Sequence, residues 1–237
     1  MANAQNHTEA SVGVVNAQAA FQSKATFYTL DSTRLEHPAV NSILKRSFDI
    51  IGAIVGLLIT AILFVPIAIA IQIDNPGPIF YSQIRCGNCG KTFRIWKFRS
   101  MVANADVLKH LVKNEAQGLI FKNKSDPRIT RVGAFLRKTS LDEFPQFWNV
   151  LMGDMSLVGT RPPTVDEVMR YKSHHWQRLN VKPGITGEWQ VRGRSSISNF
   201  EDIVKMDLNY QSRWSVIYDL QLLIETVLAV LNRKGAY

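Results

Sequence analysis

Residues 45–73 read "KRSFDIIGAIVGLLITAILFVPIAIAIQI", and the run from Ile50 to Ile73 is almost unbroken in its apolar character. This run is long enough to cross the hydrocarbon core of a bilayer as a helix. A core helix of such length normally keeps a polar face, which this run almost lacks. The segment therefore predicts a membrane helix, which either spans the bilayer or enters one leaflet and returns.

The residues around this run favour the second arrangement. Lys45 and Arg46 precede it, and positive charge marks the cytoplasmic side of a membrane helix. The chain after Ile73 is also basic, so both ends favour the same side. Pro66 removes one helical hydrogen bond and clashes with the preceding turn, which predicts a bend. We therefore expect a re-entrant helix hairpin over residues 43–73, since a plain crossing would place Lys45 and Arg46 outside the cell.

The composition limits the possible functions. The chain has 237 residues, of which 46% are hydrophobic, and its formal net charge is +9. Such a basic surplus suits nucleic acid, anionic lipid or phosphorylated small molecules. The two cysteines, Cys86 and Cys89, cannot form a disulfide framework, which fits a reducing cytoplasm. The first twenty residues lack the pattern of a secretory signal peptide.

Three regions follow from this pattern. Residues 1–42 are polar and poor in large apolar side chains, so we expect a mobile tail. Residues 43–73 form the membrane helix. Residues 74–237 are mixed and basic, and they end in "YDLQLLIETVLAVLNRKGAY" (218–237), whose helical period predicts an amphipathic helix.

Two adjacent acids stand out in "TSLDEFPQFWNVL" (139–151). One interpretation is structural, because Ser140 and Glu143 match a capping box and acids suit the first turn of a helix. The other is catalytic. Pro145 fits best in a first turn, which predicts a helix start near Asp142 and places this carboxylate beside free N–H groups that also accept phosphate. The two interpretations are compatible, since a cap can position a nucleophile.

Basic residues near the acids favour the catalytic interpretation. A carboxylate that attacks a diphosphate approaches another anion, so it needs Mg²⁺ and arginines to neutralise the charge. Arg137 precedes the acids, Arg161 follows them in "TRPP", and Arg194 lies in "RGRS". Each alone is an ordinary surface charge, but together they predict an anion pocket.

The longest motifs are "GPIFYSQIRCGNCGKTFRIWKFRSM" (77–101), "SDPRITRVGAFLRKTSLDEFPQFWNVLMGDMSLVGTRPP" (125–163) and "KPGITGEWQVRGRS" (182–195). With them, the chain from about residue 45 to 237 resembles the bacterial sugar transferases, the monotopic phosphoglycosyl transferases. The resemblance implies transfer of a sugar 1-phosphate from a nucleotide diphosphate sugar to polyprenyl phosphate at the cytoplasmic face of the bacterial inner membrane. It also implies a covalent intermediate on the aspartate of an Asp-Glu pair, and a requirement for Mg²⁺.

The resemblance assigns roles position by position. Asp142 matches the nucleophile and a Mg²⁺ ligand, and Glu143 matches its supporting acid. Lys97, Arg137, Arg161 and Arg194 match residues that bind substrate. Two departures occur: Thr160-Arg161-Pro162 replaces the usual Pro-Arg-Pro, and Val65-Pro66 replaces a frequent Ser-Pro. We expect a membrane-associated, mostly helical α+β domain with surface amphipathic helices, and a UDP-hexose donor, UDP-glucose or UDP-galactose.

Other interpretations give specific expectations. A membrane-tethered nucleic-acid-binding protein would explain the positive charge, but no helix-turn-helix, finger or RNP-type motif is present. Cys86-x-x-Cys89 has no second ligand pair at zinc-finger spacing, so we expect turn residues and not a zinc site. His174 and His175 are adjacent, which suits one metal ion poorly. The intact acid pair argues against a catalytically inactive scaffold.

Overall fold

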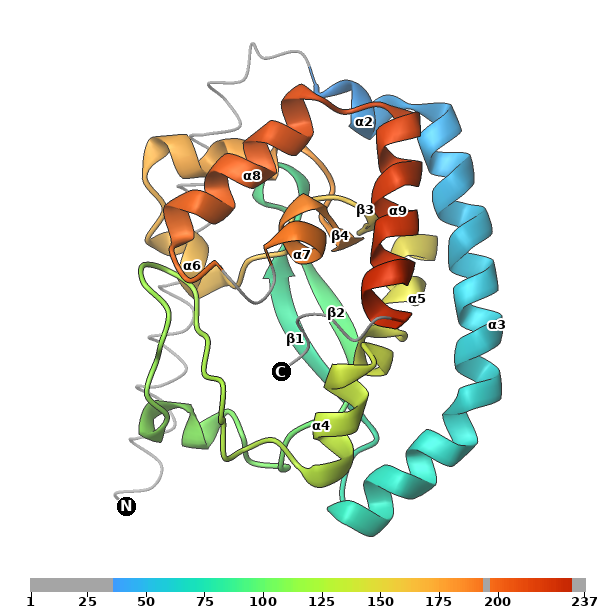
Figure 1. Ribbon diagram of the computed structural model, residues 1–237, viewed down its shortest axis with the longest axis vertical. Coiled ribbons are helices and arrows are strands. Elements are labelled where there is room, and N and C mark those ends of the chain that lie inside the picture. Colours follow the sequence, from blue (N-terminus) through green and yellow to red (C-terminus); the bar gives the residue numbers. More distant parts are fainter. Residues whose placement is uncertain (1–35, 194–196, 232–237) are drawn as a thin grey trace, which may run out of the picture.

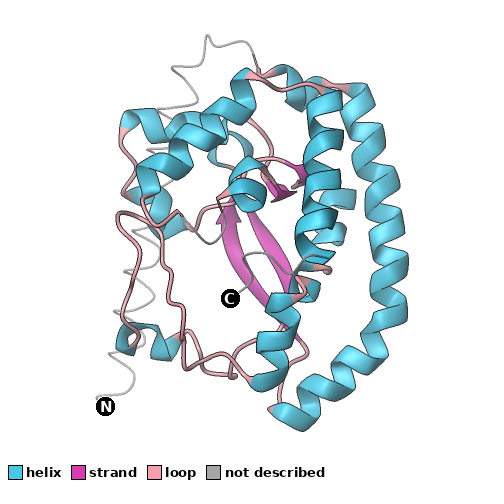
Figure 2. Ribbon diagram, viewed as in Figure 1, coloured by secondary structure: helices cyan, strands magenta, loops and turns pink. Residues whose placement is uncertain are grey.

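The structure is a computed structural model that describes residues 36–193 and 197–231. It shows a mostly helical α+β domain with two small sheets and one long helix along its flank (Figures 1 and 2). The helices are α2 (Pro38–Asn41), α3 (Ile43–Asp74), α4 (Arg131–Lys138), α5 (Gln146–Met152), α6 (Val165–Met169), α7 (Glu188–Arg192), α8 (Phe200–Ser212) and α9 (Val216–Leu231). The strands are β1 (Phe80–Cys86), β2 (Thr92–Phe98), β3 (Ser156–Val158) and β4 (Gly184–Thr186). The expected fold class is confirmed at this level.

Short 3₁₀ turns connect these elements, namely η1 (Asn88–Gly90), η2 (Val107–Leu111), η3 (Leu141–Glu143) and η4 (Ser173–Asn180). Strands β1 and β2 form an antiparallel hairpin closed by η1, and β3 pairs in parallel with β4. Residues 1–35 of the expected tail lie outside the described residues. The described end of that stretch contains α2, whose Ala39 is buried in the main core.

Helix α3 is one continuous helix of 32 residues with Pro66 inside it. It is long and apolar enough to cross a membrane, and only 22% of its most apolar window is buried, which separates it from an ordinary core helix. Figure 1 shows α3 as a curved rod that follows the domain from α2 toward α4. It is a single bent helix and not two antiparallel arms, so the hairpin stays a prediction.

Both halves of α3 pack against the same domain. In the first half, Ala53 and Gly56 lie on the buried face, and a Cβ at Gly56 would come within 2.4 Å of the Phe147 ring. The missing side chain thus lets α5 approach closely. In the second half, Ile67 and Ile71 join the apolar cluster that includes Phe98 and Leu136. Both halves of α3 therefore contact the rest of the described domain.

The two basic side chains at the start of α3, Lys45 and Arg46, are bound by other parts of the domain and do not simply face solvent. The Lys45 ammonium is buried, binds the Asp219 carboxylate at 2.5 Å and donates to the Val158 carbonyl at 3.0 Å. Arg46 donates to the carbonyls of Val150 and Leu151, both at 2.7 Å, at the end of α5. All of these partners lie more than a hundred residues along the chain from Lys45 and Arg46. The local sequence therefore could not predict them.

Candidate active site

The acid pair lies on η3, in the short connection between α4 and α5. Ser140 adopts a left-handed conformation (φ 57°) and its side chain makes no cap hydrogen bond. Helix α5 begins at Gln146, with Pro145 immediately before it. The predicted capping box is therefore wrong. The predicted helix start near Asp142 is met only by the 3₁₀ turn from Leu141 to Glu143, and the α-helix begins at Gln146. Ser140 turns the chain after α4, and regular α-helical bonding begins only beyond Pro145, which has no N–H to donate.

Asp142 is the buried member of the pair. It is 6% exposed, whereas Glu143 is partly exposed and accepts a hydrogen bond from the Lys97 ammonium at 2.7 Å. The neighbouring Leu141 and Phe144 pack on the apolar cluster that holds the second half of α3. Helix α3 therefore supports the turn that carries both acids.

Lys97 and Arg137 reach this turn from two elements that pack against η3, strand β2 and helix α4. Arg137 donates from Nε to the Ser100 hydroxyl at 2.9 Å. A Cβ at Gly133 would lie 1.9 Å from the Ser100 carbonyl oxygen, so glycine lets α4 rest directly on the chain that follows β2. The structure thus brings Lys97 into contact with Glu143, whereas Arg137 contacts Ser100 on the chain that follows β2.

Arg161 lies on the loop between β3 and α6, where it forms a two-pronged ion pair with Glu167 at 3.0 and 3.4 Å. Glu167 also completes a capping box with Thr164. Burial alone would raise the pKa of Glu167, but the Arg161 charge holds this pKa below its ordinary value. The capping-box spacing was visible in the sequence, whereas the ion pair with Arg161 was not. Arg194, the remaining predicted site residue, lies outside the described residues.

Gln146 is a site residue that the sequence reasoning missed. It lies four residues after Asp142. The intervening Phe144 and Pro145 have helical dihedral angles (φ −57° and −59°), so its side chain shares a face with Asp142. Gln146 is 2% exposed, and its Nε2 has no hydrogen-bond partner among the described residues. An unused buried amide donor, four residues after a buried acid, is a candidate contact for an oxygen-rich ligand.

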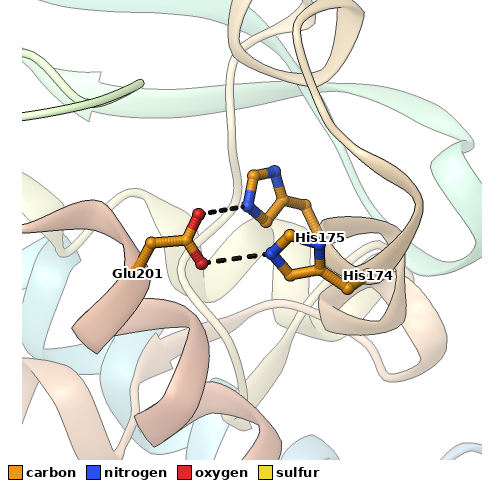
Figure 3. A group of neighbouring side chains, drawn as sticks. All are labelled: His174, His175 and Glu201. Carbon is orange, nitrogen blue, oxygen red and sulfur yellow. Dashed lines mark hydrogen bonds and ion pairs between the residues drawn. The ribbon is translucent and has the colours of Figure 1, made fainter.

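Two histidines on η4 and a glutamate on α8 form a separate cluster of side chains of the types that can bind a metal ion (Figure 3). His174 and His175 contact the two carboxylate oxygens of Glu201 through Nε2, at 3.1 and 2.9 Å. The Nδ1 atom of His175 accepts the backbone N–H of Lys172, so the ring proton is on Nε2 and that atom cannot also bind a metal ion. Burial lowers the pKa of His175, which agrees with a neutral ring. This geometry indicates a hydrogen-bonded cluster and not a metal site.

The two cysteines lie at the hairpin turn. Cys86 is buried at the end of β1, and burial raises the pKa of its thiol to about 12. Cys89 lies in η1 with a left-handed backbone (φ 52°). Neither belongs to the metal-ligand cluster found in the described part of the chain. Cys86 is therefore a buried strand residue, and only Cys89 is a turn residue as predicted.

The geometry defines a class of protein. A buried acid, held on a turn that packs with a long apolar helix and followed by a second acid bound to a lysine, is suited to act on anionic substrates. The profile of the family described as "Bacterial sugar transferase" matches residues 40–233. The chain therefore belongs to the bacterial sugar transferase family.

Individual relatives agree with this assignment. The chain is 52% identical over 196 residues to "Galactosyl transferase CpsE" of Streptococcus agalactiae serotype III, covering 82% of this chain and 43% of the relative. It is 40% identical to "UDP-glucose:undecaprenyl-phosphate glucose-1-phosphate transferase" of Escherichia coli, covering 84% of this chain and 42% of the relative. It is 37% identical to "Exopolysaccharide production protein ExoY" of Rhizobium meliloti, covering 89% of this chain and 95% of the relative. The chain thus spans less than half of the first two relatives.

Proposed function

We propose that this protein transfers a hexose 1-phosphate from a UDP-hexose to a polyprenyl phosphate, undecaprenyl phosphate in bacteria, with release of UMP. The observation that carries the proposal is the buried Asp142, on a turn whose Leu141 and Phe144 pack with α3 and whose Glu143 binds the Lys97 ammonium. The names of the relatives support the same reaction, since they refer to galactosyl transfer, UDP-glucose and undecaprenyl phosphate. They give no support to the alternative of a nucleic-acid-binding protein.

The reaction divides into two displacements at one phosphorus atom. An Asp142 carboxylate oxygen attacks the sugar-bearing phosphorus of the donor, and the bond to the bridging oxygen breaks, so that UMP leaves with the electron pair. An oxygen of the polyprenyl phosphate then attacks the same phosphorus and releases the Asp142 carboxylate. Dividing the transfer in this way avoids holding two bulky anionic substrates in one site. Ping-pong kinetics and a phosphosugar ester on Asp142 should result.

Mg²⁺ is the cofactor that this site suits. Mg²⁺ prefers carboxylate oxygens together with substrate phosphate oxygens, and a buried aspartate beside a cationic pocket offers that combination. Asp142 would hold the ion, and Glu143, whose Oε1 binds Lys97, could join it through its other carboxylate oxygen. When bound, the ion would neutralise the charge that builds up on the phosphates. Otherwise Glu143 serves to handle a proton or to keep Lys97 in place.

The proposed location is the cytoplasmic face of a bacterial inner membrane. Besides α3, the C-terminal helix and α5 expose large apolar side chains, namely Ile217, Leu220, Ile224, Val227, Leu228, Trp148 and Met152. Exposed apolar faces on helices of a basic protein suit the surface of an anionic membrane. The acceptor phosphate would reach Asp142 along this surface.

The choice of hexose can be tested directly. We expect UMP release from UDP-glucose or UDP-galactose when purified protein, polyprenyl phosphate and Mg²⁺ are combined, because relatives are named for each of these sugars. A panel of UDP-sugars, with release of UMP as the readout, identifies the donor. If no UDP-hexose releases UMP, while another nucleotide sugar does, the hexose assignment is wrong.

The bend at Pro66 gives a prediction on topology. A tag at residue 1 should stay inaccessible to a periplasmic labelling reagent in intact cells, because both halves of α3 contact the catalytic domain. Replacing Pro66→Leu restores the missing helical hydrogen bond, so we expect a larger labelled fraction and lower activity. The conservative change Ile69→Leu in the same helix is the control. Full labelling of the tag in the unmodified protein would demonstrate a spanning helix.

Arg161→Ala should cut turnover sharply. A charge-assisted contact to phosphate that acts on the transition state contributes about 2–4 kcal/mol, or roughly 30- to 1,000-fold in rate. The substitution also leaves the buried Glu167 carboxylate unpaired, so a second variant, Arg161→Ala with Glu167→Gln, separates lost stability from lost chemistry. Arg170→Ala, an exposed arginine just after α6, is the matched control. Normal turnover in both Arg161 variants would place Arg161 outside the site.

A further inference from the structure

Arg85 on strand β1 is a basic residue that the proposal above does not use. In the antiparallel hairpin, Tyr81 pairs with Lys97 and Arg85 pairs with Phe93. Paired residues and alternate residues of a strand share one face, so Arg85 lies on the same face as Lys97, which binds Glu143. Arg94 lies on the opposite face and donates to the Ser82 hydroxyl at 3.0 Å.

The Arg85 backbone and side chain fasten β1 to the loop that carries Arg161. Its Nη1 donates to the Pro162 carbonyl at 3.0 Å, and the next residue, Cys86, donates its N–H to the Pro163 carbonyl at 2.9 Å. Two guanidinium groups therefore lie close together. Burial, followed by the nearby Arg161 charge, lowers the pKa of Arg85 to about 10, so that Arg85 is still charged at neutral pH.

The carboxylates near Arg85 already have cationic partners. Glu167 holds both terminal nitrogens of Arg161, and Glu143 is bound to Lys97. The Nε atom of Arg85 is buried and finds no acceptor within the described residues. A buried guanidinium with an unused donor is costly unless an anion supplies the missing acceptor. Among the described residues, Arg85 therefore has no ion-pair partner, and its Nε remains an unused donor.

We propose that Arg85 and Arg161 together bind the diphosphate of the nucleotide donor. Guanidinium groups match phosphate oxygens in a planar, two-pronged geometry, and a diphosphate offers acceptors to two such groups at once. In this arrangement, Glu167 orients Arg161 and the Pro162 carbonyl orients Arg85, so that both cations are held ready before the donor binds. The inference rests on the proposed function, because it takes the ligand to be a nucleoside diphosphate.

The test compares the binding of UDP and uridine to the full-length protein by calorimetry. Arg85→Gln should weaken UDP binding roughly tenfold to a hundredfold and leave uridine binding unchanged, since a charged contact to phosphate is lost. Arg85→Lys keeps the positive charge but loses the planar guanidinium group and its Nε donor. Its UDP affinity should lie between those of Arg85→Gln and the unmodified protein. Arg94→Gln, on the other face of the same hairpin, should bind UDP as the unmodified protein does.

Two results would overturn the inference. One is unchanged UDP affinity in Arg85→Gln or, if that variant does not fold, in Arg85→Lys. The other is an equal loss of UDP and uridine binding, which would indicate a purely structural role in holding the Pro162 carbonyl. The proposed reaction can fail independently of this inference. If the protein binds UDP through Arg85 but releases UMP from no UDP-sugar, the binding site stands and the proposed transfer reaction is wrong.

Discussion

Asp142→Asn should abolish sugar phosphate transfer while the protein still folds and associates with membranes. Asparagine has nearly the same size and fills the same buried position, but its amide cannot attack phosphorus. Loss of a covalent nucleophile typically costs at least ~10³-fold in turnover. We therefore expect no phosphosugar adduct on the variant after incubation with labelled UDP-sugar, and no UMP burst in a rapid-mixing experiment.

The companion variants make this result specific. Glu143→Gln should retain measurable turnover, because Glu143 is assigned to supporting chemistry and is partly exposed beside Lys97. Asp202→Asn, an exposed acid paired with Lys205 on α8, should behave as the unmodified protein. If Asp142→Asn forms the adduct or turns over at the normal rate, the covalent mechanism on Asp142 is wrong.

The sequence predicted elements whose cause is local. The unbroken apolar run specifies α3, and the helical period of residues 218–237 specifies the described part of α9. The same local reasoning failed at the acid pair. Ser140 and Glu143 have capping-box spacing, but a left-handed residue and Pro145 give a 3₁₀ turn instead. The spacing of Ser140 and Glu143 does not reveal that Ser140 adopts a left-handed backbone conformation.

The partners of charged residues were the part that sequence could not supply. Arg161 was predicted to bind substrate, and that role stays a prediction. Its ion pair with Glu167 depends on how the loop after β3 folds back. Arg85 was not predicted as a site residue, and its place on the same face as Lys97 follows from the strand register. Such relations come from tertiary packing, where burial makes the pairing of each charge energetically important.

Lys45 shows the same limit most clearly, because a residue interpreted as a topology signal is the centre of a buried network. Its partner Asp219 also accepts hydrogen bonds from the Tyr210 hydroxyl at 2.8 Å and from the Trp214 indole at 3.1 Å. The network therefore connects the start of α3 to Tyr210 on α8 and to Asp219 on α9. Tyr210 and Val158 of β3 both belong to the main apolar core. We infer that it couples the membrane helix to the catalytic domain.

Asp219→Ala should therefore destabilise the protein strongly. The substitution leaves the Lys45 ammonium buried without a counter-charge and removes the acceptor for two further donors. Breaking a buried pair on one side costs about 3–5 kcal/mol of unfolding free energy, whereas removing both charges costs much less. Adding Lys45→Met to Asp219→Ala should thus restore much of the stability in denaturant unfolding followed in detergent. Lys205→Ala, which breaks only the exposed pair with Asp202, should change the unfolding free energy by less than about 1 kcal/mol. Strict additivity of the Lys45 and Asp219 effects would show that the two charges do not depend on each other, and the coupling of α3 to the domain would then rest on apolar packing alone.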